Sequence, residues 1–240
     1  WFILTHDYVW GKNATAGTRG TMKKVGAEEL GELMVPQGTR DFSAQLLRIR
    51  SAKPQVVIAN VAGIEQTALR EQAYEFGSDK DAAWGFAQQD FPDMVTLGPK
   101  KAFGYFCTTW HYTLNEPGVK EFTERFKKRW AGAPIPVPDN VSSNGYIAAR
   151  ELAGAIERAG TTRNHDVIKA LEGHVIKDNF RKYPSTIRPW DHLVGQMLYL
   201  AKTKKEGDMK EKWDMIEMIS DVAPEVAAPP QSISKCKMQS

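Results

Sequence analysis

The side chains that could carry out covalent chemistry form no recognisable catalytic motif. The nucleophile-elbow pattern GxSxG is absent, because Ser142-Ser143-Asn144-Gly145 lacks the leading glycine. No GxGxxG or Walker pattern occurs at a strand-to-helix turn, so a nucleotide site is not predicted. The 29 carboxylates are too many for an acid–base pair to be chosen by spacing. The sequence therefore indicates no catalytic residue and gives no support for an enzyme.

Metal ligands are not grouped either. The five histidines are scattered, with no pair four residues apart, and the two cysteines match no metal-ligand spacing. We therefore predict no metal and no cofactor. Cys107 and Cys236 could form one disulfide in an oxidising compartment. The alternative, which we favour, is two free thiols with Cys107 buried in a strand.

The overall composition is that of a folded globular protein, with 42% apolar and 25% charged residues. The 32 basic and 29 acidic side chains are interspersed and the net charge is only +3, so nucleic-acid binding is not predicted. No run approaches the roughly 20 apolar residues that a membrane span needs. The first residues lack the features of a signal peptide, and we expect that such a signal was removed or lies upstream.

Apolar periodicity predicts strands and helices in alternation over the first half of the chain. This order is typical of a parallel sheet flanked by helices. A loop and a short turn are expected near residues 91–97. The predicted strands are 1–4, 30–35, 55–59, 83–87 and 103–109, and the predicted helices are 13–25, about 42–53 and 64–76.

Ligands of parallel sheets bind beyond the carboxyl ends of the strands. That rule places three segments on one rim of the predicted sheet: Asp7–Gly11, Asn60–Gly63 and Gln88–Phe91. A solute site is therefore expected there.

The second half of the chain is predicted to open with helices. Apolar stripes mark helices ending near Trp130 and Gly160, joined by the extended proline-rich segment 134–138. The later elements are a helix over 165–171, strands over 185–187, 196–202 and 212–219, and a proline-rich tail over 223–230.

Several motifs occur in one order and spacing that is informative in combination. They are Asp7-Tyr8-Val9-Trp10-Gly11, Pro36-Gln37-Gly38-Thr39-Arg40-Asp41-Phe42-Ser43, Ala52-Lys53-Pro54-Gln55-Val56-Val57, Gln72-Ala73-Tyr74-Glu75-Phe76-Gly77 and the stretch from Gly145 to Gly160. With them the sequence resembles the leucine/isoleucine/valine-binding family of type I periplasmic binding proteins, over nearly the whole chain.

The resemblance implies an α/β fold with two Rossmann-like lobes, each a parallel central sheet flanked by helices, and with the first lobe incomplete. Residues 1–110 would form the second lobe, 111–175 would return to the first lobe, and 176–240 would cross back and end in a C-terminal tail. In this family a small solute is trapped when the hinged lobes close.

The function implied by the resemblance is that of a periplasmic substrate-binding component of an ABC importer. Its partners would be a small-molecule solute and the transporter permease, and it would act as a monomer. The alternative is a ligand-sensing receptor domain of the same fold.

The resemblance also implies candidate ligand contacts. Trp10 falls where relatives place an aromatic residue beside the ligand, with Tyr8 close by. A role for Trp10 as an aromatic residue of the core is an equal alternative. After the next strand, Asn60, Ala62 and Gly63 would approach the solute, although a turn or capping role for Asn60 is the stronger reading. Ser142 and Ser143 could reach the cleft, and helix capping is again the stronger reading.

The stretch that would recognise an amino group departs from the family. Amino-acid-binding relatives place an acid after the next strand to pair with the ligand ammonium, whereas this chain has Gln88 and Gln89, with Asp90 nearby. An amide offers no full counter-charge. We therefore expect that the ligand is an aromatic or other small organic acid or an amide, at least as readily as an α-amino acid.

Overall fold

The computed structural model describes residues 1–237, which fall into two compact units. The first unit comprises Trp1–Cys107 and Leu200–Ile219, and the second comprises Thr108–Tyr199 and the segment from Ser220 onward. Which unit corresponds to which lobe of the predicted architecture stays a prediction.

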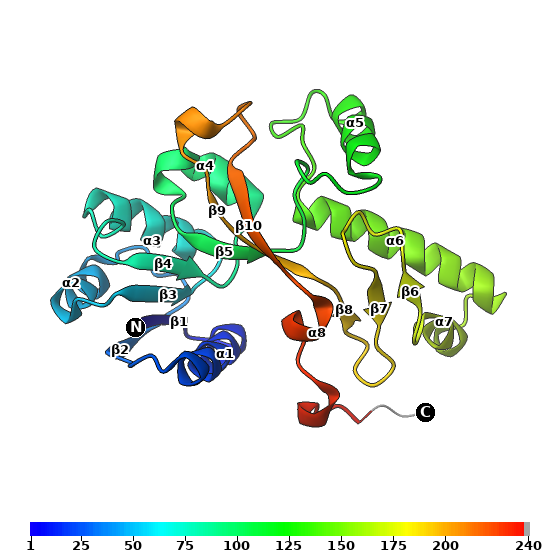
Figure 1. Ribbon diagram of the computed structural model, residues 1–240, viewed down its shortest axis with the longest axis horizontal. Helices are drawn as coiled ribbons and strands as arrows, with labels where there is room; N and C mark the ends of the chain where they lie inside the picture. Colours follow the sequence, from blue (N-terminus) through cyan, green and yellow to red (C-terminus); the bar gives the residue numbers. More distant parts are fainter. Residues whose placement is uncertain (238–240) are drawn as a thin grey trace. The chain divides into compact units, whose positions relative to one another are not determined.

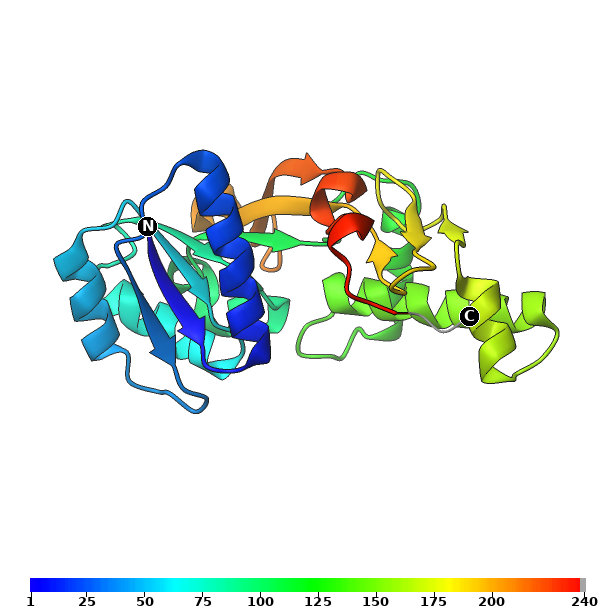
Figure 2. The same cartoon turned by 90° about the horizontal axis from the view of Figure 1, so that it is seen from below.

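The first unit contains most residues of a seven-stranded sheet with the strand order β10-β9-β5-β4-β3-β1-β2. Helix α1 covers one face of this sheet, while α3 and α4 lie on the opposite face (Figures 1 and 2). The strands are β1 (Phe2–His6), β2 (Gly31–Val35), β3 (Val56–Asn60), β4 (Ala83–Phe86), β5 (Tyr105–Thr108), β9 (Leu198–Thr203) and β10 (Ile216–Val222), and the helices are α1 (Val9–Val25), α2 (Ser43–Ala52), α3 (Ile64–Glu75) and α4 (Phe91–Lys101).

The first five strands pair in parallel, as the alternation of strands and helices predicts. Strand β1 is buried along its whole length, because helices cover both faces of the sheet and a central parallel strand then has no solvent side. Ile3 and Leu4 are fully buried, and Val57 and Ala59 of β3 pack in the same core. The predicted α/β class with a parallel sheet flanked by helices is confirmed.

Helix α1 begins earlier than the sequence pattern predicts. The prediction placed its start at Asn13, but the helix begins at Val9, with Tyr8 at the N-cap and Trp10 in the first turn. The cause is Gly11, where an added Cβ would lie 2.1 Å from the backbone oxygen of His6. Because Gly11 has no side chain, the helix can start directly against the end of β1. The prediction had placed no helix in residues 7–11.

Helix α4 corrects a second prediction. The segment 91–97, expected as a loop and a short turn, is helical, and Pro92 lies in its first turn. The missing N–H group of proline costs no helical hydrogen bond at that position. Met94 is fully buried on this helix. The sequence pattern failed here because Gly98, with a φ of 73°, and Pro99 interrupt the helix with a kink.

The second unit carries helices followed by a small antiparallel sheet, β6-β7-β8. Helix α6 begins at a side-chain cap, Asp139, whose carboxylate accepts from the backbone amide of Ser142. Short strands β6 and β8 were not predicted, and the strand predicted over 212–219 is instead β10. The elements are α5 (Val119–Arg129), α6 (Asn140–Ala159), α7 (Asn164–Leu171), β6 (Val175–Ile176), β7 (Ser185–Ile187), β8 (Val194–Gly195) and α8 (Pro224–Ala227).

Both cysteines are free thiols. Cys107 lies in β5, as predicted, but its residue is exposed and not buried, since it occupies an outward position on a strand that alternates exposed and buried residues. Within residues 1–237, no helix is both long enough and apolar enough to cross a membrane. The same residues contain no group of three or more His, Cys, Asp or Glu side chains placed to hold a metal ion.

Candidate functional site

The carboxyl ends of three neighbouring strands bring the predicted contact segments to one edge of the first sheet. Thr5 of β1 is level with Asn60 of β3, and Ala59 is level with Phe86 of β4. Because these strands are parallel, the segments that follow them emerge at the same edge. We call the residues 7–11, 60–63 and 87–91 the strand-end rim.

Two aromatic side chains mark one part of the strand-end rim. The rings of Tyr8 and Trp10 are stacked, with centroids 6.0 Å apart and planes 22° apart, and both residues are partly exposed. Tyr8 also meets the buried ring of His6 edge-on at 4.7 Å. Stacked rings that are partly open to solvent present a flat apolar surface to a ligand.

Asn60 points away from solvent. Its residue is 1% exposed, and its side-chain amide donates to the hydroxyls of Thr15 at 2.9 Å and Thr18 at 3.1 Å. These two threonines lie on α1. The side chain of Asn60 therefore fixes α1, and with it the aromatic pair, against the end of β3.

Ala62 and Gly63 form the turn that leads into α3. Gly63 has a φ of 69°, a conformation that favours glycine, and it is exposed. Behind this turn the buried side-chain amide of Gln66 donates to the carbonyl oxygens of Val61 and Gln88, at 2.8 and 2.7 Å. Gln66 thus ties two loops of the strand-end rim together, which no sequence motif indicated.

Gln88 and Asp90 lie two positions apart in the sequence and interact in the structure. The amide of Gln88 lies 3.1 and 3.3 Å from the two carboxylate oxygens of Asp90. Gln88 is exposed and Asp90 is partly exposed. Both groups can therefore exchange this hydrogen bond for one to a solute without burying an unpaired group.

Sequence reasoning missed His6 and Glu65, which lie behind the strand-end rim. His6 is 4% exposed, and among the described residues neither ring nitrogen has a hydrogen-bond partner. Its Nε2 lies 4.0 Å from a carboxylate oxygen of Glu65. The available signal was the position of His6 directly after the apolar run Phe2–Leu4 and Thr5.

The Glu65 carboxylate holds the loop that follows β2. It accepts from the backbone amide of Gly38 at 2.6 Å. Burial raises the pKa of this carboxyl, but the backbone hydrogen bonds and the nearby His6 and Arg40 outweigh burial, so that the pKa lies below its ordinary value. The charged form is therefore the one that the fold stabilises.

We expect Glu65→Gln to lower the free energy of unfolding at pH 7 by about 1 kcal/mol, because an amide replaces a charged acceptor. A carboxyl with a depressed pKa in the fold stabilises it above the unfolded pKa, and that contribution is lost as the pH falls through the folded value. The deficit of the variant should therefore shrink as the pH falls below about 4.5, the ordinary value for glutamate. Urea denaturation between pH 7 and pH 3 measures it.

The matched control for this prediction is Glu157→Gln, at an exposed position on α6. It should change the free energy of unfolding at pH 7 by less than about 0.5 kcal/mol, as is usual for an exposed position. A Glu65→Gln deficit that stayed constant down to pH 3 would contradict the assignment.

Ser142 and Ser143 lie in the second unit, in the first turn of α6. The Ser142 hydroxyl donates to the cap residue Asp139 at 2.5 Å, and the buried Ser143 donates to the carbonyl oxygen of Asn140 at 3.1 Å. Both hydroxyls thus help to form the start of the helix.

Comparisons with known proteins agree on one family. A family model described as a periplasmic binding protein matches residues 1–208. The Leu/Ile/Val-binding protein homolog 3 of Brucella melitensis is 25% identical over 170 residues, which are 70% of this chain and 45% of that protein. The chain therefore spans less than half the length of this curated relative.

Solved structures show the same fold. An amino acid ABC transporter substrate-binding protein from Pseudomonas fluorescens superposes with a TM-score of 0.87 at 22% identity, covering 99% of this chain and 62% of that one. An ABC transporter solute-binding protein from Rhodopseudomonas palustris, in complex with p-hydroxybenzoic acid, gives a TM-score of 0.82 at 19% identity, covering 98% and 62%. The type I periplasmic binding fold is thus shared over nearly all of this chain.

Proposed function

Because the chain belongs to the periplasmic binding protein family, we propose that it is the substrate-binding component of an ABC importer. It would bind a small solute reversibly in the periplasm and deliver it unaltered to the transporter permease. Such a carrier needs no catalytic residue and no cofactor, in keeping with the lack of catalytic motifs in the sequence.

The observation that carries this proposal is the strand-end rim of the first unit. Three parallel strands end level with one another, and the segments after them present an aromatic pair, an open glycine turn and an exposed amide and carboxylate. Parallel sheets bind small molecules at such edges. The proposed contacts are Tyr8, Trp10, Ala62, Gly63, Gln88 and Asp90, with Asn60 positioning α1, whereas the hydroxyls of Ser142 and Ser143 serve the start of α6.

The chemistry of the strand-end rim favours a small aromatic carboxylate or amide as the solute. An aromatic ring would lie against Tyr8 and Trp10, and the Gln88 amide would donate to a carboxylate or carbonyl oxygen. A free ammonium group is less well served at Asp7, because that carboxylate is already paired with Lys12 at 2.9 Å. That the Rhodopseudomonas palustris relative was solved with p-hydroxybenzoic acid supports this solute class.

Titration calorimetry of the chain with 4-hydroxybenzoate and with L-leucine tests the proposal. We expect 4-hydroxybenzoate to bind more tightly, and Trp10→Ala to weaken its binding about tenfold through the loss of ring contact. The fold should survive this substitution because Trp10 is partly exposed.

Trp130→Ala is the matched control, since Trp130 is 52% exposed and belongs to the second unit. It should bind like the unaltered chain. The solute should also be recovered unchanged after incubation, as judged by chromatography. If neither solute binds, or if Trp10→Ala binds with full affinity, the strand-end rim is not the solute site.

A further inference from the structure

Helix α3 begins at the strand-end rim, and two residues of its first turn hold the loops around it. Glu65 accepts from the backbone amide of Gly38, in the loop that follows β2. Gln66, the next residue, is 2% exposed, and its side-chain amide donates to the carbonyl oxygens of Val61 and Gln88 at 2.8 and 2.7 Å. The start of α3 is therefore bonded to the loops that follow three strands of the sheet.

Gln66 joins two of these loops through a single nitrogen atom. A side-chain amide has two N–H groups, and here one is bonded to the loop after β3 and the other to the loop after β4. Both acceptors are backbone oxygens, so the bonds fix the course of the chain itself. Because Gln66 is buried, breaking either bond would leave a polar atom without a partner, which is costly.

Other hydrogen bonds of the loop after β4 do not fix its distance from the loop after β3. The side chain of Gln89 donates to the backbone oxygen of Asp90 at 2.8 Å, within the same loop. The amide of Ala87 donates to the backbone oxygen of Ala59 at 3.3 Å, where the two strands end. Beyond the strand ends, the cross-link between the two loops is supplied by Gln66.

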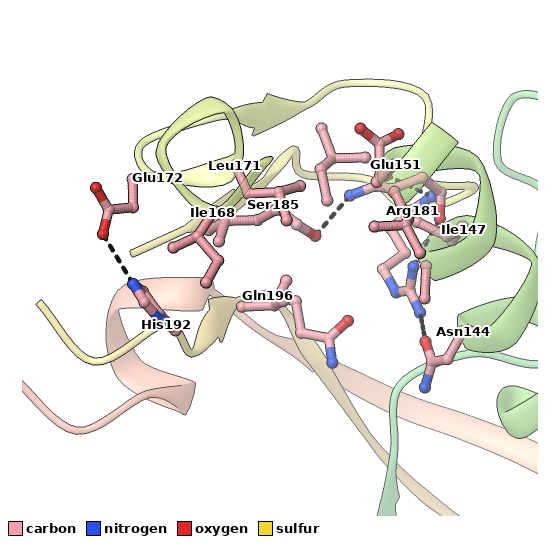
Figure 3. A pocket seen from close by; sticks show the side chains of 16 residues that line it. Asn144, Ile147, Glu151, Ile168, Leu171, Glu172, Arg181, Ser185, His192 and Gln196 are labelled. Carbon is pink, nitrogen blue, oxygen red and sulfur yellow. Dashed lines mark hydrogen bonds and ion pairs between the residues drawn. The ribbon is translucent and has the colours of Figure 1, made fainter. Parts of the chain in front are cut away.

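Buried donors that join separate segments also occur in the second unit. Arg181 donates to the backbone oxygen of Thr109 at 2.9 Å and to the side-chain oxygen of Asn144 at 2.5 Å, and Figure 3 shows the second of these bonds. Such cross-links stabilise a fold wherever they occur. Gln66 differs because both of its acceptors belong to loops of the strand-end rim.

We propose that Gln66 is a positioning residue for solute binding. It does not touch the solute, but it holds the glycine turn at Gly63 and the backbone of Gln88 at the spacing that the head group of an aromatic carboxylate or amide requires. A site whose contacts are fixed before the ligand arrives pays less ordering entropy on binding and therefore binds more tightly. This inference rests on the proposed function, because it takes the strand-end rim as the solute site.

Titration calorimetry with 4-hydroxybenzoate tests the proposal on the variant Gln66→Met, which keeps the length of the side chain and removes both donors. We expect its affinity to fall about tenfold, because the solute must then order the two loops itself. The 240-residue chain serves as the reference.

Gln72→Met is the matched control. Gln72 lies on the same helix, and its side chain accepts from the backbone amide of Phe42 at 2.7 Å and donates to the carbonyl oxygen of Arg40 at 2.6 Å. It therefore also makes two hydrogen bonds to a neighbouring loop, but that loop is not part of the strand-end rim. Gln72→Met should bind 4-hydroxybenzoate like the unaltered chain.

Two further measurements separate positioning from a general loss of stability. Hydrogen exchange of the ligand-free variants should be faster in residues 60–63 and 87–91 for Gln66→Met, and faster in residues 36–42 for Gln72→Met. In a double-mutant cycle, Gln66→Met combined with Gln88→Ala should lose less affinity than the product of the two single losses, because Gln66 acts through Gln88.

Gln66→Asn is a second variant in case Gln66→Met does not fold, as judged by circular dichroism. It keeps a buried amide that is too short to reach both oxygens, and it should also lose affinity. Full affinity in the Gln66 variants, an equal loss in Gln72→Met, or losses that multiply fully in the cycle would overturn the role of Gln66 alone. If the unaltered chain does not bind 4-hydroxybenzoate, the proposed function fails for this solute class, and the role of Gln66 fails with it.

Discussion

We expect Gly11→Ala to lower the free energy of unfolding by about 3 kcal/mol, the upper part of the range for forcing extra atoms into a packed site. An alanine Cβ would lie 2.1 Å from the backbone oxygen of His6 and 2.9 Å from its Cβ. Both neighbours belong to a central, buried strand, so neither can move without disturbing the sheet. Either α1 must shift or its first turn must unwind.

Chemical denaturation followed by circular dichroism measures this loss, and Gly20→Ala is the matched control. Gly20 lies on the same helix, and an added Cβ there meets no atom within 4 Å. Because alanine is the better helix former, Gly20→Ala should raise stability by up to about 1 kcal/mol. If Gly11→Ala were as stable as the control, the close approach of α1 to β1 would be wrong.

The displacement of α1 should also reach the strand-end rim, because this helix carries Trp10 in its first turn. Gly11→Ala should therefore weaken 4-hydroxybenzoate binding even at temperatures where the chain stays folded.

The second large effect is expected for Trp110→Ala, which should lower the free energy of unfolding by about 3–5 kcal/mol, as for other buried aromatic residues. Trp110 is 1% exposed and meets the ring of Phe122 edge-on at 5.8 Å. Phe122 in turn stacks on Phe180 with centroids 5.0 Å apart. Truncation would leave a cavity at the centre of the aromatic core of the second unit.

Trp130→Ala is the control, because the same side chain is removed from a position that is 52% exposed. Its effect should stay below about 1 kcal/mol, as is usual for surface substitutions. Hydrogen exchange should show that Trp110→Ala reduces protection mainly in the second unit. Similar losses for the two variants would mean that Trp110 is not part of a packed core.

The sequence was sufficient to predict the α/β class, because that prediction depends on local order. Short apolar runs of strand length alternate with segments whose apolar residues recur at helical spacing. In the structure, the strands β1, β3 and β4 pair in parallel, as this alternation predicts. The same order brings the segments after these strands to one edge, whichever side chains they carry. The strand-end rim could therefore be located before any coordinates were known.

Element boundaries were less predictable where backbone contacts override propensity. Asn13 is a good capping residue, yet α1 starts four residues earlier because Gly11 allows close contact with β1. In α4, which was expected to be a loop and a short turn, burial of Phe91 and Met94 maintains a helix that is kinked at Gly98. Such tertiary contacts leave no periodic signal in the sequence.

What the sequence alone determined is the order of elements, and with it the α/β fold class and the edge of the sheet where polar loops gather. The tertiary structure decided the direction and pairing of single side chains. Asn60 is turned inward to Thr15, and the buried Arg181 donates to the backbone oxygen of Thr109. The physical reason is that strand and helix patterns depend on neighbours a few residues apart, whereas a side chain's partners here lie about 40 to 70 residues away.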